Sequence, residues 1–255
     1  MWYLTVVLLL EIWLEFRADI VRLSQTTTGL TKIVYRALTL GSQNVSPAAR
    51  ALDDKVGFAI TVIGIPSAFL LHGYVGFIFG SVKANPWWST PMMPIVFLFS
   101  AMVSGIAGVM LLYMVASKVR GMRINIECVD TIARYLFYTF IIDFSLEMLD
   151  LLHRIYEADE SFKSLDFMVH TRLFLSHIVV QLLFGTLMPL VLLAITQVVK
   201  FEERTRIRIY SAAGIATLIG IFAMRWNVVI GGQIFSKSFE TKGVQTGGGY
   251  DCTPV

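Results

Sequence analysis

Long apolar segments alternate with polar segments along the chain. The apolar segments are mostly about 17 to 25 residues long, which is the length a helix needs to cross ~30 Å of hydrocarbon at a rise of about 1.5 Å per residue. The pattern therefore predicts an all-α fold, a polytopic bundle of about six transmembrane helices. These helices are expected at residues 2–16, 56–79, 95–117, 132–152, 173–199 and 207–231.

The first segment is the weakest of the six predicted spans. It is short and contains Glu11 and Glu15, so an amphipathic helix lying in the membrane interface is an alternative for it. The polar loop at 17–55 could hold a short surface helix but no separate domain. We expect one membrane domain over 1–240, followed by a flexible glycine-containing tail at 241–255.

Composition supports a membrane protein and excludes several soluble classes. Apolar residues make up 56% of the chain and charged residues 15%, whereas soluble domains carry about 25% charged residues. No basic stripe with interleaved aromatic residues indicates nucleic-acid binding. Cys128 and Cys252 lie too far apart for a C-x-x-C site and give no ligand set for an iron-sulfur cluster, so any such cluster is expected in a partner.

The distribution of Lys and Arg predicts the orientation in the membrane. Basic residues are concentrated in the loops after the first, third and fifth segments, while the second loop has Lys83 as its only basic residue and the fourth is acidic. Cytoplasmic loops carry the excess of Lys and Arg. We therefore expect a multi-pass protein of a prokaryotic cytoplasmic (inner) membrane, with the N-terminus and the loops near Trp87 and Glu160 outside.

Polar residues within the apolar segments are the candidate functional residues, because burying an ionisable group in a membrane costs about 2.5–3.5 kcal/mol on insertion scales. Several of them fall roughly 9 to 14 Å below the outer surface, counted at the helical rise per residue. Pairs four residues apart can also face one cavity. The candidates are His72, Asp143, Glu147, His177, Gln181 and Arg225.

Two chemistries fit such a group. In a quinone site, a neutral imidazole or a carboxylate binds a quinol hydroxyl and accepts its proton. A haem b held between His72 and His177 is the alternative, with neighbouring glycines leaving room for the macrocycle. A purely structural ion pair of Arg225 with Asp143 or Glu147 would leave both histidines unexplained. A transporter is less consistent, because no matching pair of broken helices occurs.

Three stretches of the sequence resemble a known family. They read WLEFRAD at 13–19, GIPSAFLLHGYVGFIFGSVKAN at 64–85 followed by PWWSTPMMPIVFLFSAMVSG, and RWNVVIGGQIFSKS at 225–238. They resemble the NrfD-type membrane subunits of the polysulfide reductase family, closest to the branch that contains DsrP of sulfur-metabolism complexes and HybB of a hydrogenase. The likeness extends over nearly the whole chain.

The resemblance implies a function. Such subunits contain no haem, so the resemblance implies neither haem nor another metal in this chain. They exchange electrons between menaquinone or ubiquinone, which is the substrate, and a ferredoxin-like iron-sulfur subunit docked on the outer face. By position, His72 resembles the family's membrane histidine near the quinone. Arg225 resembles a structural or proton-path arginine. The other candidates, Asp143, Glu147 and His177, rest on depth alone.

The family has more membrane helices than this chain, which resembles it without the N-terminal and last helices. Either the chain is a truncated, split or fragmentary product, or a further polypeptide supplies those helices. The other expected partners are the subunits of the redox complex and the lipid bilayer. The leading interpretation is a quinone-dependent oxidoreductase subunit that is not catalytic alone. The alternative is a membrane anchor that holds redox subunits without quinone chemistry.

Overall fold

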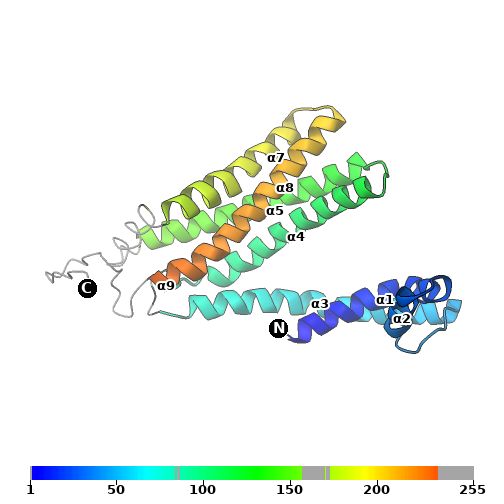
Figure 1. Cartoon of the computed structure of the whole chain (residues 1–255). Helices are drawn as coiled ribbons and strands as arrows, with labels where there is room; N and C mark the ends of the chain where they lie inside the picture. The colour runs from blue at the N-terminus through cyan, green and yellow to red at the C-terminus, as the bar shows by residue number, and fades with distance from the viewer. Residues whose placement is uncertain (1, 84, 86, 157–169, 171–172, 235–255) are drawn as a thin grey trace. The chain divides into compact units, whose positions relative to one another are not determined.

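The computed structural model describes residues 2–83, 85, 87–156, 170 and 173–234 of the chain (Figure 1). Within these residues the regular structure is helical and contains no strand, so the predicted all-α membrane fold is confirmed. Four helical stretches of the described residues are long and apolar enough to cross a membrane. They are Pro47–Gly80, Met93–Val119, Phe174–Val198 and Glu203–Gly231.

Helices also occupy the first and fourth predicted segments. These are α1 (Trp2–Thr26) and α5 (Ile126–Tyr156), and neither is among the four apolar stretches. All six predicted segments are therefore helical. Their boundaries differ from the prediction, because α1 continues well past Phe16 and α3 (Pro47–Gly80) begins nine residues before Val56. Hydropathy marks the membrane-buried part of a helix, whereas the backbone hydrogen bonds continue into the polar flanks.

The chain divides into two compact units, Met1–Leu71 and His72–Val255. Each unit is described by itself. The prediction of one membrane domain over 1–240 stays a prediction, and the predicted flexible tail at 241–255 lies outside the described residues.

In the first unit, α1 is joined to the polar segment that follows it by side-chain hydrogen bonds. Arg17 is buried and donates to Asp53 Oδ2 from Nε at 2.8 Å and from Nη2 at 2.5 Å, and to Ser42 Oγ from Nη1 at 2.9 Å. Trp13 Nε1 donates to the carbonyl oxygen of Leu38, the last residue of α2 (Leu30–Leu38). The WLEFRAD stretch thus holds α1, α2 and the start of α3 together.

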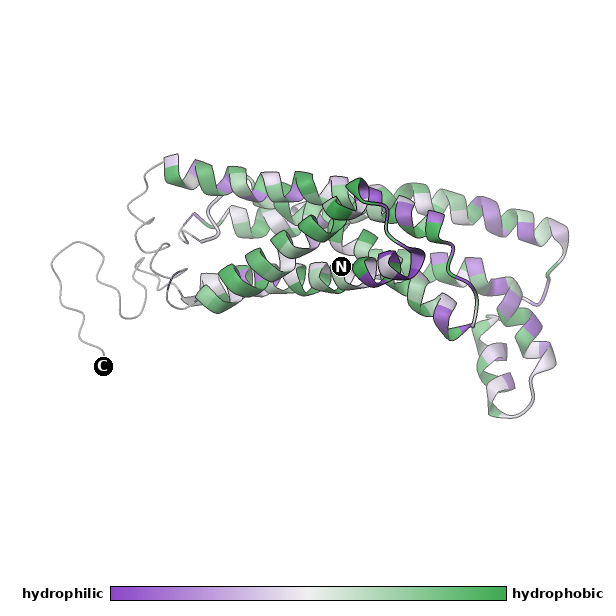
Figure 2. Cartoon of the chain, turned by 90° about the horizontal axis from the view of Figure 1, so that it is seen from above, coloured by the Kyte–Doolittle hydropathy of each residue, from purple (hydrophilic) through white to green (hydrophobic). Residues whose placement is uncertain are grey.

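The second unit is a bundle of antiparallel helices (Figure 1). It contains α4 (Met93–Val119), α5, the π-helix η1 (Phe174–Leu187) continued by α7 (Met188–Val198), and α8 (Glu203–Trp226) continued by η2 (Asn227–Gly231) and α9 (Gly232–Ile234). Helix α8 contacts η1, α4 and α7, and α4 contacts α5. Apolar residues follow the lengths of the long helices, with polar residues gathered toward helix ends and connections (Figure 2).

The core of this bundle is dense in the half that we predict to face the cytoplasm. Asp130 of α5 pairs with Arg206 of α8 and accepts a hydrogen bond from the Tyr210 hydroxyl at 2.8 Å. The apolar side chains around this pair are almost fully buried. They include Val103, Ala107, Met110, Val129, Ala133, Leu136, Phe140, Leu193 and Ala213.

Two glycines set the contact between η1 and α8. A Cβ atom on Gly185 would lie 2.2 Å from the Cα atom of Gly220, and a Cβ atom on Gly220 would lie 2.5 Å from the Cα atom of Gly185. The backbones therefore meet without any side chain between them, as small residues allow in membrane helix pairs. This contact fixes where η1 lies along α8.

Replacing either glycine should weaken this contact. We expect Gly185→Ala and Gly220→Ala to destabilise the protein by about 1–3 kcal/mol, the usual cost of overpacking. The control is Gly108→Ala in α4, where a Cβ atom has no neighbour within 4 Å. The measurement is the midpoint of thermal unfolding in detergent. Alanine favours a helix more than glycine does, so Gly108→Ala should not lower the midpoint. A similar decrease in all three variants would therefore contradict the close-contact explanation.

Candidate functional site

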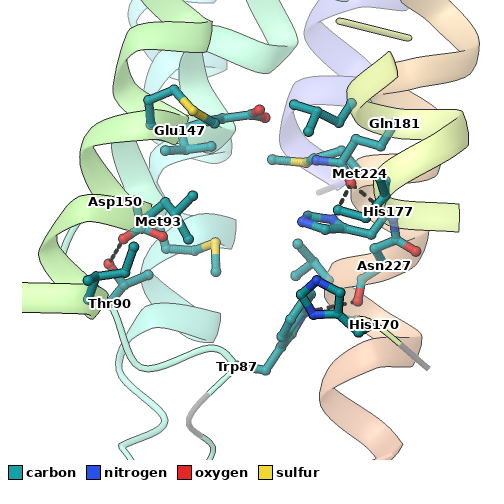
Figure 3. A pocket seen from close by; sticks show the side chains of 17 residues that line it. Trp87, Thr90, Met93, Glu147, Asp150, His170, His177, Gln181, Met224 and Asn227 are labelled. Atoms are coloured by element: carbon teal, nitrogen blue, oxygen red, sulfur yellow. Dashed lines mark hydrogen bonds between the residues drawn. The ribbon is translucent and has the colours of Figure 1, made fainter. Parts of the chain in front are cut away.

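A cavity of about 420 Å³ lies in the second unit, at the end of the bundle near Trp87 (Figure 3). Helices α4 and α5 form one wall, and η1, α8 and η2 form the opposite wall. Most of its lining is apolar. The apolar side chains are Met93, Val96, Met148, Leu151, Ile155, Ile178, Leu182, Met224 and Val228.

Polar side chains stand on both walls of this cavity. Glu147 and Asp150 come from α5, and Figure 3 shows Glu147 extending from that helix into the cavity. His177, Gln181 and Asn227 lie on the opposite wall. A carboxylate on one wall therefore faces an imidazole and two amides on the other. His170 also contributes to the lining.

The π-helix η1 positions His177 and Gln181. The hydroxyl of Thr186 donates to the backbone oxygen of Gln181, five residues earlier, at 3.0 Å, which matches the wider turn of a π-helix. Pro189 follows directly where α7 begins, and proline has no N–H for a hydrogen bond to the preceding turn. The change of helix type therefore coincides with this proline. π-Helical turns are rare and often occur at functional sites.

A short hydrogen-bond chain joins the polar side chains of this wall. Gln181 Oε1 accepts a hydrogen bond from Asn227 Nδ2 at 2.9 Å and lies 3.0 Å from His177 Nδ1. Asn227 and Gln181 are buried, being 1% and 7% exposed, and His177 is only partly buried. The chain thus runs from α8 and η2, through the amide of Gln181, to an imidazole at the cavity surface.

The turn after α3 holds this wall through its two tryptophans. Trp87 Nε1 donates to the backbone oxygen of Asn227 at 3.0 Å, and Trp88 Nε1 donates to that of Val228 at 2.6 Å. The Trp87 ring also contacts the His177 ring edge-to-face, with ring centroids 5.7 Å apart. Both indoles are therefore anchored on η2.

Two glycines of the RWNVVIGG stretch make room for these indoles. A Cβ atom on Gly232 would lie 2.1 Å from a ring atom of Trp88, and one on Gly231 would lie 3.0 Å from Trp87 Nε1. Asn85 Nδ2 donates to the backbone oxygen of Gly232 at 2.6 Å. The turn and the end of the last helix are thus packed directly on each other.

The same turn is also tied to the opposite wall. Thr90 donates a hydrogen bond to Asp150 of α5, and Thr90 is buried. The segment from Trp87 to Thr90 therefore connects η2 on one side of the cavity with α5 on the other. This arrangement fixes the width of the cavity at its outer end.

Asp143 and Arg225 lie next to the cavity but do not line it. Arg225 Nη2 donates to Ser100 Oγ at 3.3 Å, and its guanidinium carbon lies 5.2 Å from the centroid of the Phe97 ring. Asp143 is 2% exposed and lies within electrostatic range of Arg225 and Glu147. Its Oδ1 atom has no hydrogen-bond partner among the described residues. A charge buried in a membrane needs a partner of opposite charge, and Arg225 lies near Asp143.

The structure brings part of the predicted group together. Glu147, His177 and Gln181 line one cavity. Asp143 precedes Glu147 by one helical turn, while Arg225 points toward α4. His72 is a partly buried residue of α3 and is not among the residues that line the cavity. Its role near a quinone, inferred from resemblance, stays a prediction.

Several polar residues of the cavity were not among the candidates, namely Thr90, Asp150, His170 and Asn227. Asp150 lies near the end of the fourth predicted segment, where acidic residues also occur at a membrane boundary, so its polarity gave no distinct signal. Asn227 lies inside the sixth segment and in the RWN stretch, so its polarity at that depth was a usable signal. No group of three His, Cys, Asp or Glu residues suited to a metal ion occurs within the described part of the chain.

One known family matches nearly the whole chain. The sequence model of the family described as "Polysulphide reductase, NrfD" matches residues 1–237. The chain belongs to this family. Family membership together with the apolar helices makes it a multi-pass membrane protein. The closer resemblance to the DsrP and HybB branch stays a prediction.

Two NrfD-related proteins match shorter segments. Over 118 residues the chain is 40% identical to a selenate reductase subunit of Mesobacillus selenatarsenatis, covering 44% of this chain and 28% of that protein. Over 100 residues it is 31% identical to "Protein NrfD" of Escherichia coli, covering 38% of this chain and 28% of that protein. The matches thus span less than a third of either relative.

Removing one indole hydrogen bond should loosen the cavity wall. Trp88→Phe keeps an aromatic ring beside Gly232 but removes the indole hydrogen bond to the Val228 oxygen, so we expect a loss of about 0.5–1.5 kcal/mol. The matched control is Trp226→Phe, because Trp226 is 54% exposed on α8. Thermal unfolding in detergent measures both. Equal midpoints for the two variants would show that the hydrogen bond does not stabilise the fold.

Proposed function

We propose that this chain is a quinone-interacting membrane subunit of a reductase complex, and that the cavity between Glu147 and His177 binds the quinone head group. The observation that carries the proposal is the placement of these two side chains on opposite walls of an apolar cavity. A quinol has two hydroxyl groups on opposite sides of a flat ring, so one can face each wall. Ligand cavities typically combine an apolar lining with a few polar groups.

The cavity also suits the isoprenoid tail of a membrane quinone. Leu151 and Ile155 belong to its lining and are 45% and 48% exposed on α5, so the cavity reaches the outer surface of the bundle. In a membrane, lipid covers that surface. A tail can therefore extend from the cavity into the bilayer while the head group stays among Trp87, Glu147 and His177.

The proposed chemistry is the exchange of two electrons and two protons. On quinol oxidation, Glu147 and His177 accept the two hydroxyl protons, and the two electrons pass one at a time to an iron-sulfur cluster of a partner protein. Quinone reduction is the reverse. Asp143 provides the next proton acceptor one helical turn below Glu147, and the charge of Arg225 balances the buried carboxylates. Such positioned acid-base groups typically contribute factors of about 10²–10⁴ in rate.

The partner assignment rests on family membership and on the likeness to a subunit of a selenate reductase. We propose a ferredoxin-like iron-sulfur subunit at the end of the bundle where the Trp87 turn lies, since electrons must leave from the cavity. That end faces outside when Lys and Arg of the other loops face the cytoplasm. A prokaryotic cytoplasmic membrane is the corresponding location.

Glu147→Gln and His177→Ala test this function in the intact complex. Each should lower quinol-dependent turnover by about 10²–10⁴-fold because it removes a proton acceptor, while the complex still assembles. His153→Asn is the matched control, since His153 is on α5 but outside the cavity lining. Turnover is measured on purified complexes in which all subunits are present. Normal turnover in both cavity variants would refute the site.

Binding of a quinone analogue separates this proposal from a pure anchor. The purified complex should bind the analogue saturably, and a Met224→Trp change that fills the cavity should abolish binding. An anchor without quinone chemistry would show no saturable binding. In the same assay, His72→Ala tests the residue inferred from resemblance. A loss of binding in that variant would place His72 in the site despite its position outside the lining.

A further inference from the structure

The amide of Gln181 receives two hydrogen bonds at one atom. Its Oε1 atom lies 2.9 Å from Asn227 Nδ2 and 3.0 Å from His177 Nδ1. An amide oxygen can only accept hydrogen bonds. The proton of a neutral His177 must therefore sit on Nδ1, which leaves Nε2 as the basic atom.

Several contacts hold the side chains of Gln181, Asn227 and His177 in place. Asn227 is the first residue of η2, it is 1% exposed, and its backbone oxygen is bound by Trp87 Nε1. The Trp87 ring contacts His177, and Thr186 binds the backbone oxygen of Gln181. Neither amide is free to solvent. The hydrogen bond at one ring nitrogen of a histidine decides the role of the other.

We propose that Gln181 and Asn227 are positioning residues that keep the proton of His177 on Nδ1, so that Nε2 faces the cavity as the proton acceptor for a quinol hydroxyl. This inference rests on the proposed quinone function. On oxidation both O–H bonds of the quinol break: one proton forms an N–H bond at Nε2, the other forms an O–H bond at Glu147, and the two electrons pass one at a time to the partner's iron-sulfur cluster. Quinone reduction uses the same steps in reverse.

Neither positioning residue transfers the proton itself. With the opposite ring proton, Nε2 could still donate a hydrogen bond to a quinone oxygen, but it could not accept a proton. The arrangement therefore acts on the proton-transfer step rather than on quinone affinity. A histidine in the wrong tautomer is a known cause of large rate losses in other enzymes.

Two isosteric substitutions in the intact complex test the arrangement. In Gln181→Glu, a carboxylate oxygen still accepts from both Asn227 and His177, so the ring proton stays on Nδ1. In Asn227→Asp, an acceptor faces Gln181 Oε1, so the amide of Gln181 must rotate and donate to His177 Nδ1. That rotation moves the ring proton to Nε2.

We expect the two variants to differ. Asn227→Asp should lower kcat by about 10²-fold or more, the contribution of a positioned base, and leave the Kd of a quinone analogue within a few-fold. Gln181→Glu should lower kcat much less than Asn227→Asp does, because its carboxylate still accepts from His177 Nδ1. Assembly and thermal midpoints are measured for both, and His177→Ala is included as the reference for loss of the base.

The remaining outcomes overturn the proposal in distinguishable ways. The reverse pattern, with Gln181→Glu inactive and Asn227→Asp active, would show that the two amides have the opposite orientation. Equal effects of the two variants would show that they do not control the ring proton. If His177→Ala itself keeps normal turnover, the failure lies in the proposed quinone function and not in the positioning of His177.

Discussion

The half of the bundle that contains the cavity depends on the contact between the tryptophan turn and the end of the last helix. Trp87 and Trp88 donate indole hydrogen bonds to successive backbone oxygens of η2, and two glycines leave the space that the rings occupy. These bonds give the backbone oxygens at the end of the last helix indole donors, in a surrounding where polar backbone groups need partners. The same turn is bound to α5 through Thr90. One short segment therefore determines how far apart the cavity walls stand.

The two halves of the bundle differ in how they are packed. In one half, side chains such as Val103, Leu136 and Leu193 fill the interior completely, and Asp130 binds both Arg206 and Tyr210. In the other half, helical turns of π type and direct backbone contacts leave a cavity. A dense core provides stability, and the irregular end leaves room for a ligand. This division explains why the candidate polar residues gather at one end.

Helix α5 carries three carboxylates whose environments differ, namely Asp143, Glu147 and Asp150. Asp143 is buried between helices near Arg225, Glu147 enters the cavity, and Asp150 is bound to the turn at the outer end. The same helix therefore places three carboxylates in three different surroundings. Their difference comes from what each one contacts, because the side chains themselves are almost the same.

Sequence reasoning correctly located the helices, since apolar length and membrane thickness determine where a helix can cross the bilayer. Equal depth and four-residue spacing also selected Glu147, His177 and Gln181. Helical rise and periodicity are properties of a single helix, so they can be read from the sequence without knowing how the helices pack. Depth alone could not separate these residues from His72 or Arg225, since it says nothing about the direction in which each helix faces. The tertiary structure decided that direction. Glycine contacts and indole hydrogen bonds set the rotation of η1 and η2, and only that rotation placed Asn227 behind His177.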